Sequence, residues 1–296
     1  MPPTPPPPPP LPPRPRTRIP SASDFAPLAA ELTVSLVFPD PPESTTAILI
    51  LLHGLGDAEA AFAAFARNLA LPGVLAVAVR GVHPLPPALV GHIDDDDDDD
   101  DENNNGLRLG PTPQTRHFYW GDDLTLARAG GDLDPDPGFD KAERLVLGRL
   151  VRETLVGRCG WETEDVLLFG FGQGGSLALG LASRLRVGPP VVEQEGEEGA
   201  AATGRAFKGA VSVGGPLLPS TIPSARARTR AATPVLLCHG ARSDVVDEEA
   251  VEVLKREFAH VRVAAWKRPD DGMPRNREEM LPIMQFFADR LRGGGG

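Results

Sequence analysis

The segment Gly170-Phe171-Gly172-Gln173-Gly174 constrains the fold more than any other part of the chain. An apolar run at 166–169 leads into it, and leucines spaced four residues apart follow it (Leu177, Leu181 and Leu185). This spacing predicts a helix, so the segment is expected to form a sharp turn between a strand and a helix. The same turn with the pattern G-x-S-x-G presents a serine hydroxyl above a parallel sheet. Here the central residue is Gly172, which has no side chain that could react.

The rest of the chain alternates between apolar and amphipathic segments. Strands are expected at 32–38, 46–52, 74–79, 165–170, 208–213, 234–239 and 261–266, and longer helices at about 58–70, 141–157, 174–186, 247–259 and 276–292. This alternation predicts an α/β fold with a mostly parallel central sheet and helices on both faces. Sites in such sheets lie at the carboxyl ends of the strands. The segments that follow three of the strands, at His53, Gly172 and Asp244, are therefore expected to converge. Pro282 is expected to kink or split the last helix.

Four segments resemble, in the same order, motifs of the phospholipase/carboxylesterase family, which includes the acyl-protein thioesterases. Residues 52–57 (LHGLGD) are similar to the family's L-H-G-x-G-D, and residues 170–175 (GFGQGG) to its G-F-S-Q-G-G with one change. Residues 207–212 resemble the strand after the turn and helix, and residues 234–246 resemble the segment that carries the acid of the triad. The match covers roughly residues 33–292. It implies an α/β-hydrolase fold and the activity of a serine carboxylic-ester or thioester hydrolase.

The resemblance also assigns positions in the site, and two of them hold the wrong residue. Gly172 stands at the nucleophile position, and Asp244 retains the acid position. Aligning Gly272-Met273 with the family's Y-x-G-M-G-H places Arg275 where the catalytic histidine is expected, and no histidine lies between 261 and 296. A triad needs a nucleophile, a base and an orienting acid. The sequence therefore predicts a degenerate triad.

Other parts of the site are retained by resemblance. The backbone N–H groups of Leu55 and Gln173 correspond to the two donors of the oxyanion hole, and main-chain donors do not depend on the side chain at 172. Tyr119 and Trp120 resemble a displaced version of the family's W-[FY]-D segment near the acyl pocket. The alternative for this pair is an aromatic anchor beneath a long loop. His53 and His239, which precede glycines at strand ends, are interpreted as structural histidines.

Three functions remain open. The first is a non-catalytic relative of the esterases that binds an acyl or ester small molecule or a partner. The second is an active ester or thioester hydrolase with an unconventional nucleophile or water; Ser176, Ser212 and Ser243 are the serines considered, and all are expected to lie out of attack geometry. The third, the weakest, is a scaffold that works through its tail and acidic loop.

Composition limits the partners and the compartment. The net charge is −11, but residues 94–102 are eight aspartates and one glutamate, so the remainder carries only −2. This balance argues against nucleic-acid binding, which needs clustered Lys and Arg. The two cysteines, Cys159 and Cys238, indicate neither a disulfide framework nor a zinc site. No metal or cofactor is expected, no apolar run is long enough to cross a bilayer, and a cytoplasmic location is predicted.

The organisation predicted is one domain with a tail and two insertions. Residues 1–20 contain twelve prolines and are expected to form a disordered, extended tail. Within it, Pro9–Arg14 fits the P-x-x-P-x-R pattern that SH3-type domains recognise, although an unused tail is the alternative. Residues 21–293 are expected to form a single α/β-hydrolase domain. The insertions at 91–112 and 188–206 read as flexible surface loops, and the acidic one is more typical of a solvated segment than of an ion site.

Overall fold

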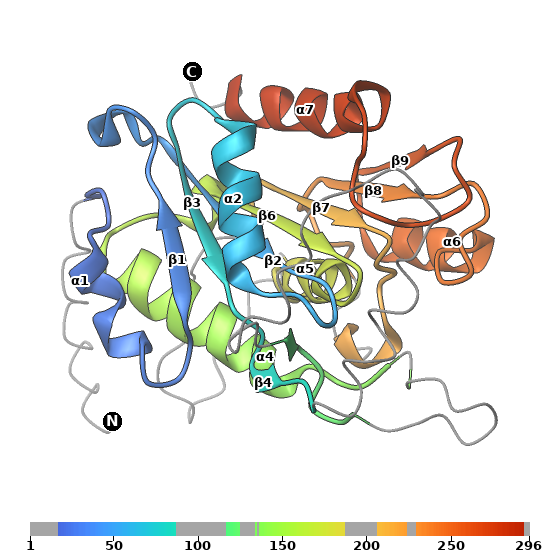
Figure 1. Cartoon of the computed structure of the whole chain (residues 1–296), viewed down its shortest axis with the longest axis horizontal. Helices are drawn as coiled ribbons and strands as arrows, with labels where there is room; N and C mark the ends of the chain where they lie inside the picture. Colours follow the sequence, from blue (N-terminus) through green and yellow to red (C-terminus); the bar gives the residue numbers. More distant parts are fainter. Residues whose placement is uncertain are drawn as a thin grey trace, which may run out of the picture.

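The structure is a computed structural model of the 296-residue chain, and it describes residues 17–86, 117–124, 134, 136–186, 206–223 and 229–292. A sheet of seven strands forms its centre (Figure 1). The strands are β1 (Val34–Val37), β2 (Ala47–Leu52), β3 (Val74–Val79), β6 (Val166–Phe171), β7 (Gly209–Val213), β8 (Val235–His239) and β9 (Val261–Ala265), in the spatial order β1-β3-β2-β6-β7-β8-β9. Only the edge strand β1 pairs antiparallel; the other pairs in this sheet are parallel.

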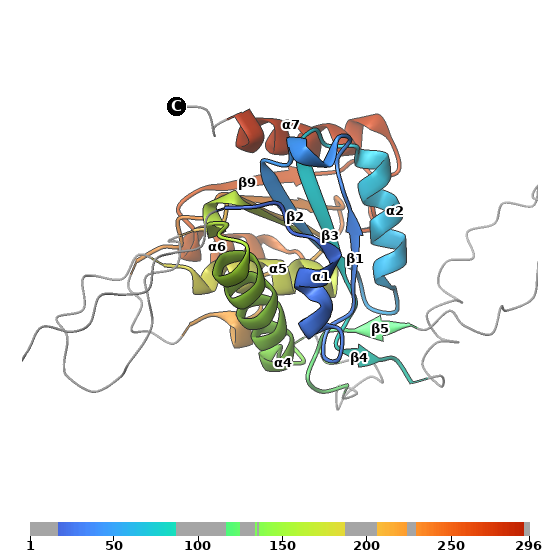
Figure 2. The same ribbon diagram turned by 90° about the vertical axis from the view of Figure 1, so that its left-hand side faces the viewer.

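Helices cover both faces of the sheet (Figure 2). One face carries α2 (Glu59–Leu69) and α7 (Arg277–Arg292). The other carries α1 (Ala22–Phe25), α5 (Gln173–Arg184), α6 (Glu248–Glu257) and α4 (Asp140–Glu143), which continues as the π-helix η3 (Arg144–Arg158). Strand β2 shows why both layers form, because its alternate residues enter different cores: Ile48, Ile50 and Leu52 pack on the α5 side, and Ala47, Leu49 and Leu51 on the α2 side. A continuous apolar strand is the pattern of a sheet that is buried on both faces.

The fold predicted from the sequence is confirmed. Every predicted strand and every longer helix is present, with ends that differ by a few residues. Pro282 does not split the last helix, because α7 continues through it. The structure adds elements that the sequence did not predict: the short helix α1 and the small antiparallel pair of β4 (His83–Pro84) and β5 (Phe118–Tyr119). No helix in the described ranges is long and apolar enough to span a membrane.

The body of the protein begins earlier than predicted. The Thr17 hydroxyl donates to the carbonyl of Gly160 at 2.7 Å, and the Arg18 N–H donates to the carbonyl of Cys159 at 2.9 Å. The indole N–H of Trp161 in turn donates to the Arg18 carbonyl at 2.8 Å, and Pro20 is buried. Residues 17–20 therefore belong to the folded part, not to the tail. Residues 1–16, which include the Pro9–Arg14 motif, and both predicted insertions, apart from Ala206 at the end of the second, lie outside the described residues.

Candidate functional site

Gly172 forms the turn between β6 and α5. Its dihedral angles are φ 49° and ψ −119°, which is the strained, left-handed type of backbone that few residues other than glycine adopt. The turn is held by main-chain bonds: the Gly172 N–H donates to the Val213 carbonyl of β7 at 2.8 Å, and the Ser176 N–H donates to the Gly172 carbonyl at 3.0 Å. The predicted strand–turn–helix is therefore present, and none of these bonds depends on the side chain at position 172.

The glycines of this turn serve different purposes. A Cβ atom on Gly170 would overlap the backbone of Gly174, and a Cβ atom on Gly174 would overlap the carbonyl oxygen of Leu52 in β2. These two glycines are required because the helix starts directly against the central strands. At Gly172, in contrast, an added Cβ meets nothing within 4 Å. A side chain would fit above this turn, so packing does not explain why the nucleophile position holds glycine.

His53 shapes the turn that follows β2. Its ring is fully buried, and its Nε2 accepts a hydrogen bond from the Gly81 N–H at 2.8 Å. Because Nε2 is an acceptor, the proton of the neutral ring is on Nδ1, which donates to the Gly54 carbonyl at 2.7 Å. The indole N–H of Trp120 donates to the His53 carbonyl at 2.8 Å. The structural role predicted for His53 is thus confirmed, and its bonds fix the chain that carries the Leu55 N–H.

The two predicted oxyanion donors lie at one cavity. Among the described residues, neither the Leu55 nor the Gln173 backbone N–H meets an acceptor outside its own element. The side chain of Gln173 is turned to the scaffold, where its Oε1 accepts from the Trp120 N–H at 2.7 Å. The cavity has a volume of about 510 Å³. Its wall is made by Leu55, Asp123, Leu124, Asp134, Pro137, Gly172, Gln173, Ser176, Gly214, Pro216, Leu218, Asp244 and Val245. Four of the predicted site residues, namely Leu55, Gly172, Gln173 and Asp244, therefore share it, and we call it the elbow cavity.

The aromatic pair predicted for the acyl pocket does not line this cavity. Trp120 is fully buried in the main core and binds the backbone of His53 and the side chain of Gln173. Tyr119 belongs to β5, and its ring stacks on His83 with the centroids 5.2 Å apart. These contacts are those of an aromatic anchor, which was the alternative to an acyl-pocket wall. Trp120 thus supports the turn after β2 that carries the Leu55 N–H, which we call the oxyanion turn, and neither aromatic residue lines the cavity.

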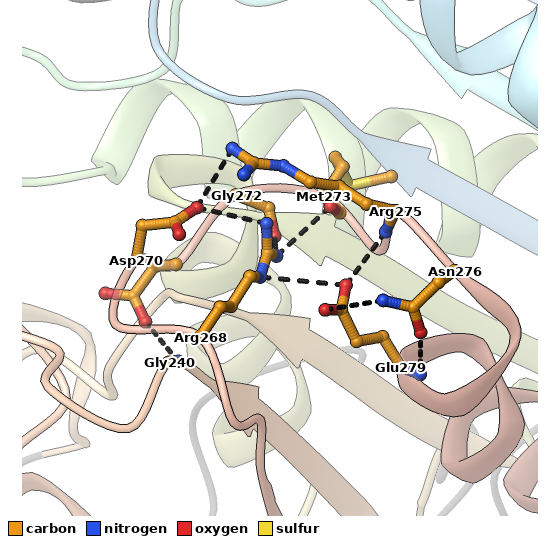
Figure 3. Close-up of polar contacts among 9 residues, drawn as sticks. Gly240, Arg268, Asp270, Gly272, Met273, Arg275, Asn276 and Glu279 are labelled. Carbon is orange, nitrogen blue, oxygen red and sulfur yellow. Dashed lines mark hydrogen bonds and ion pairs between the residues drawn. The ribbon is translucent and has the colours of Figure 1, made fainter. Parts of the chain in front are cut away.

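Arg275, aligned with the catalytic histidine, lies outside the elbow cavity. Its guanidinium contacts Asp270 at 3.1 Å, and its backbone N–H donates to Glu279 at 2.8 Å. It lines a separate groove with residues at the start of α7, among them Met280 and Leu281. Figure 3 shows its side chain extended over the loop between β9 and α7. Arg275 is therefore not positioned as a substitute for the base.

Arg268 organises the loop that would carry the histidine (Figure 3). Its guanidinium donates to Asp270 at 3.0 Å, to the Met273 carbonyl at 3.1 Å and to the Gly272 carbonyl. The same group lies 4.6 Å from the centre of the Trp266 ring, which adds a cation–π contact. The loop is thus built around the guanidinium of Arg268, whose side chain is 11% exposed. The family pattern gave no sign of this, because it specifies only the residues near the histidine.

Asp271 is the residue of this loop that reaches the site, and sequence reasoning missed it. Its carboxylate accepts from the Gly240 N–H at 2.8 Å and from the Ser243 hydroxyl at 2.5 Å. A Cβ on Gly214, a residue of the cavity wall, would lie 2.7 Å from the Asp271 Cβ. Asp271 therefore fills the space between the elbow and the Asp244 loop, with both carboxylate oxygens already bonded. No motif identifies it, since its position depends on the path of the whole loop.

None of the serines considered as substitutes has a histidine partner within the described ranges. Ser212 is buried and donates to the Gly215 carbonyl at 2.6 Å, and Ser243 donates to Asp271. Ser176 lines the cavity but is only 3% exposed, because it lies inside α5. A serine hydroxyl needs a nearby base to become nucleophilic at neutral pH. The described cavity wall therefore brings the predicted oxyanion donors and Asp244 together without a serine that has a histidine partner.

His53 makes stability depend on pH. Burial is the largest cause that holds its pKa below 6.5; the Gly54 carbonyl acts in the opposite direction but does not cancel it. A buried histidine with a lowered pKa contributes its full stability above pH 6.5 and loses it as pH falls through the folded-state pKa. We expect urea midpoints to fall between pH 7.5 and 5.5, and to fall less in His53→Gln. The pKa of His83 is lowered as well, so the same measurement on His83→Gln shows how much of the pH dependence His83 contributes. Equal pH dependence in His53→Gln and the wild type would contradict this role.

The comparisons with known proteins agree with the fold and the motifs. The sequence profile of the serine hydrolase (FSH1) family matches residues 43–275. An uncharacterized hydrolase of Schizosaccharomyces pombe is 25% identical over 249 residues, which are 82% of this chain and 83% of that protein. The crystal structure of Zea mays acyl-protein thioesterase 2 is similar with a TM-score of 0.53 at 18% identity, covering 88% of this chain and 99% of that one. The Bacillus cereus carboxylesterase is similar with a TM-score of 0.55 at 14% identity, covering 91% and 100%.

These two structures share the α/β-hydrolase fold with this chain, and their identity is too low to carry their activity over. The profile match is stronger evidence, because it spans the turn after β2, the elbow and the acid loop in one continuous segment. It confirms the relationship that the motifs at 52–57, 170–175 and 234–246 indicated. The chain belongs to the serine hydrolase (FSH1) family.

Proposed function

We propose that this chain is a catalytically degenerate relative of the carboxylesterases and acyl-protein thioesterases, which binds an acyl or ester small molecule in the elbow cavity without hydrolysing it. The observation that carries the proposal is Gly172. It stands at the nucleophile position beside two unoccupied N–H donors, and no histidine is among the described residues of the cavity wall. Binding needs the cavity and the donors, whereas hydrolysis also needs the two missing side chains.

The energetic argument favours binding over slow catalysis. Loss of triad members lowers the turnover of serine proteases by about 10⁴- to 10⁶-fold. The remaining oxyanion hole and binding leave a rate of ~10³-fold over water, which is too slow for a working esterase. The oxyanion N–H groups can still donate to the carbonyl oxygen of an intact ester or amide. With no Oγ at position 172, the bound carbonyl carbon faces open space, which suits a ligand that is held and released unchanged.

A second function keeps some support. The Leu55 and Gln173 donors and Asp244 share one cavity, which favours an active hydrolase with an unconventional nucleophile or water. Two measurements separate the alternatives: labelling with a fluorophosphonate probe, and turnover of p-nitrophenyl acetate and p-nitrophenyl decanoate. The binding proposal predicts no labelling and no turnover above the buffer rate. Stoichiometric labelling, or turnover that Asp244→Ala abolishes, would establish the hydrolase instead.

Restoring the nucleophile is expected to destabilise the protein without activating it. Gly172→Ser places a side chain in open space, but the positive φ makes a residue with Cβ less favourable by about 1–3 kcal/mol. For a domain of this size this corresponds to a decrease in Tm of about 2–4 °C per kcal/mol. Gly148→Ser is the matched control, because Gly148 also has open space around its missing Cβ and has no positive φ. It is expected to leave Tm nearly unchanged.

The same variant tests the assignment of the missing base. Gly172→Ser is expected to stay unlabelled by the fluorophosphonate, because no imidazole lines the described cavity wall to take the serine proton. Rapid labelling would show that another group acts as the base, and an unchanged or raised Tm would show that the turn does not strain a side chain.

Two further proposals have only the sequence as support. They are the recognition of Pro9–Arg14 by an SH3-type domain and a cytoplasmic location. The motif lies outside the described residues, so a binding assay of the full chain against SH3 domains, with Arg14→Ala as the control, is the test that applies.

A further inference from the structure

The elbow cavity carries negative charge on its wall. Asp123, Asp134 and Asp244 line it, and no lysine, arginine or histidine is among its described lining residues. The three carboxylates come from segments far apart in the sequence, two near β5 and α4 and one after β8. All three residues are exposed, so the fold brings them together at the part of the wall that contacts solvent.

These carboxylates are available to a ligand, unlike their neighbours. Asp123 and Asp244 have no side-chain hydrogen bond or ion pair within the described residues, and Asp134 accepts one, from the Asp136 N–H at 2.9 Å. Two neighbouring aspartates are already bonded within the protein. Asp122 accepts from the first N–H groups of α4, and Asp136 accepts from Ser220. A carboxylate without a protein partner at a cavity wall favours a positively charged ligand group.

The rest of the wall fits an organic molecule. No group of three or more His, Cys, Asp or Glu side chains in the described part of the chain is arranged to hold a metal ion. Between the carboxylates, the wall is apolar, with leucine, proline and valine side chains (Leu55, Leu124, Pro137, Pro216, Leu218 and Val245). A volume of about 510 Å³ is in the range of small-molecule sites. The cavity thus combines two carbonyl-binding N–H groups, an apolar wall and carboxylates.

We infer that the ligand of the elbow cavity is a cationic acyl compound, an ester or amide whose amine or quaternary ammonium group faces Asp123, Asp134 and Asp244. This inference rests on the proposed function, since it names the class of ligand that the same site holds. The carbonyl oxygen accepts from the Leu55 and Gln173 N–H groups, and the cation approaches the carboxylates. A free fatty acid fits poorly, because its carboxylate would face three like charges.

Two esters of nearly the same shape test the inference. Butyrylcholine carries a quaternary nitrogen where 3,3-dimethylbutyl butyrate carries a carbon atom, so the two differ mainly in charge. Calorimetric titration of the full chain at low salt is expected to give butyrylcholine at least about tenfold tighter binding, with octanoate the weakest of the three. Equal affinity of the two esters would overturn the cationic ligand while leaving the proposed function intact. Binding of none of the three would overturn both.

Charge-neutralising variants locate the effect. Asp123→Asn and Asp244→Asn are each expected to reduce the ratio of butyrylcholine to 3,3-dimethylbutyl butyrate affinity by about threefold, and 0.5 M salt is expected to reduce it in the wild type. The ratio is insensitive to partial unfolding, because both esters need the same folded site. Glu43→Gln removes one charge in η2 (Pro42–Ser44), away from the cavity wall, and is expected to leave the ratio unchanged. An equal decrease in Glu43→Gln would show that only net charge matters.

Discussion

Gly174→Ala is expected to yield no stably folded protein, whereas Gly172→Ala, two residues away, is expected to fold. At position 174 the added Cβ would overlap the carbonyl oxygens of Leu52 and His53. These atoms belong to the central strand β2 and the turn after it, which other bonds hold in place, so neither can move aside. The expected loss exceeds about 4–5 kcal/mol, which is a large part of the stability of an ordinary domain.

At position 172 the added Cβ meets nothing within 4 Å, and the expected loss is only the cost of a positive φ, about 1–3 kcal/mol. Soluble yield and urea midpoints of the two variants measure the difference. Gly148→Ala is the control for adding a Cβ in open space, and it is expected to fold like the wild type. Comparable stability of Gly174→Ala and Gly172→Ala would show that the helix is not held as close to β2 as described.

This contrast bears on the glycine that stands at the predicted nucleophile position. Gly174 cannot be exchanged without losing the turn, whereas Gly172 could hold a serine at a modest cost in stability. Glycine at position 172 is therefore compatible with an intact strand, turn and cavity, which is why we propose binding as the function of this site.

The central sheet could be predicted from the sequence because its signals are local. The run Ala47–Leu52 is apolar at every position, as expected for a strand covered on both faces, and the spacing of Leu177, Leu181 and Leu185 predicted α5. The small β4–β5 pair could not be predicted. It joins His83 to Tyr119 across more than thirty residues of sequence, and its residues carry no alternating pattern.

Residues of the cavity could be predicted where they directly follow the end of a strand. They could not be predicted where the path of a long loop sets their position. Leu55, Gln173 and Asp244 lie at the elbow cavity because parallel strands end at one edge of the sheet. The positions of Arg275 and Asp271 depend on the path of the loop after β9, which the partly buried Arg268 guanidinium sets. Aligning Gly272-Met273 with a family pattern counts residues along the chain, and it contains no information about that path.

The second large effect is expected at the Glu59–Arg80 pair, which supports the oxyanion turn. Arg80 donates from Nε and Nη2 to the two oxygens of Glu59 at 2.8 and 2.5 Å, and Glu59 is 5% exposed. The guanidinium also lies 4.8 Å from the centre of the Phe118 ring. Phe118 in turn pairs with the turn itself, since its carbonyl accepts from the Gly56 N–H at 2.9 Å and its N–H donates to the Asp57 carbonyl at 3.1 Å.

Arg80→Met is expected to lower the free energy of unfolding by about 3–5 kcal/mol at pH 7, because it leaves a buried carboxylate without a partner. Arg80→Met with Glu59→Leu is expected to recover most of this loss, since the second change removes the stranded charge. Arg262→Met is the control for losing an arginine ion pair at the surface: its partner Asp289 is largely exposed, and the expected change is about 0–1 kcal/mol.

The pH dependence of the unfolding free energy shows whether Arg80→Met destabilises the protein through the unpaired charge of Glu59 or through lost packing. In the wild type, burial tends to raise the pKa of Glu59, but the hydrogen bonds and charge of Arg80 outweigh it and hold the pKa below its ordinary value of 4.5. The pair therefore stabilises the fold above pH 4.5, and this contribution is lost as pH falls through the folded-state pKa. Arg80→Met removes the hydrogen bonds and the charge that oppose burial most, so the pKa of Glu59 should rise. Protonation of Glu59 should then remove the unpaired charge and reduce the destabilisation of the variant as pH falls. The difference in unfolding free energy between wild type and Arg80→Met is thus expected to shrink from pH 7 to pH 4.5. A difference that stays constant over this range would mean that Arg80 supports the oxyanion turn through its contact with Phe118 and not through its charge.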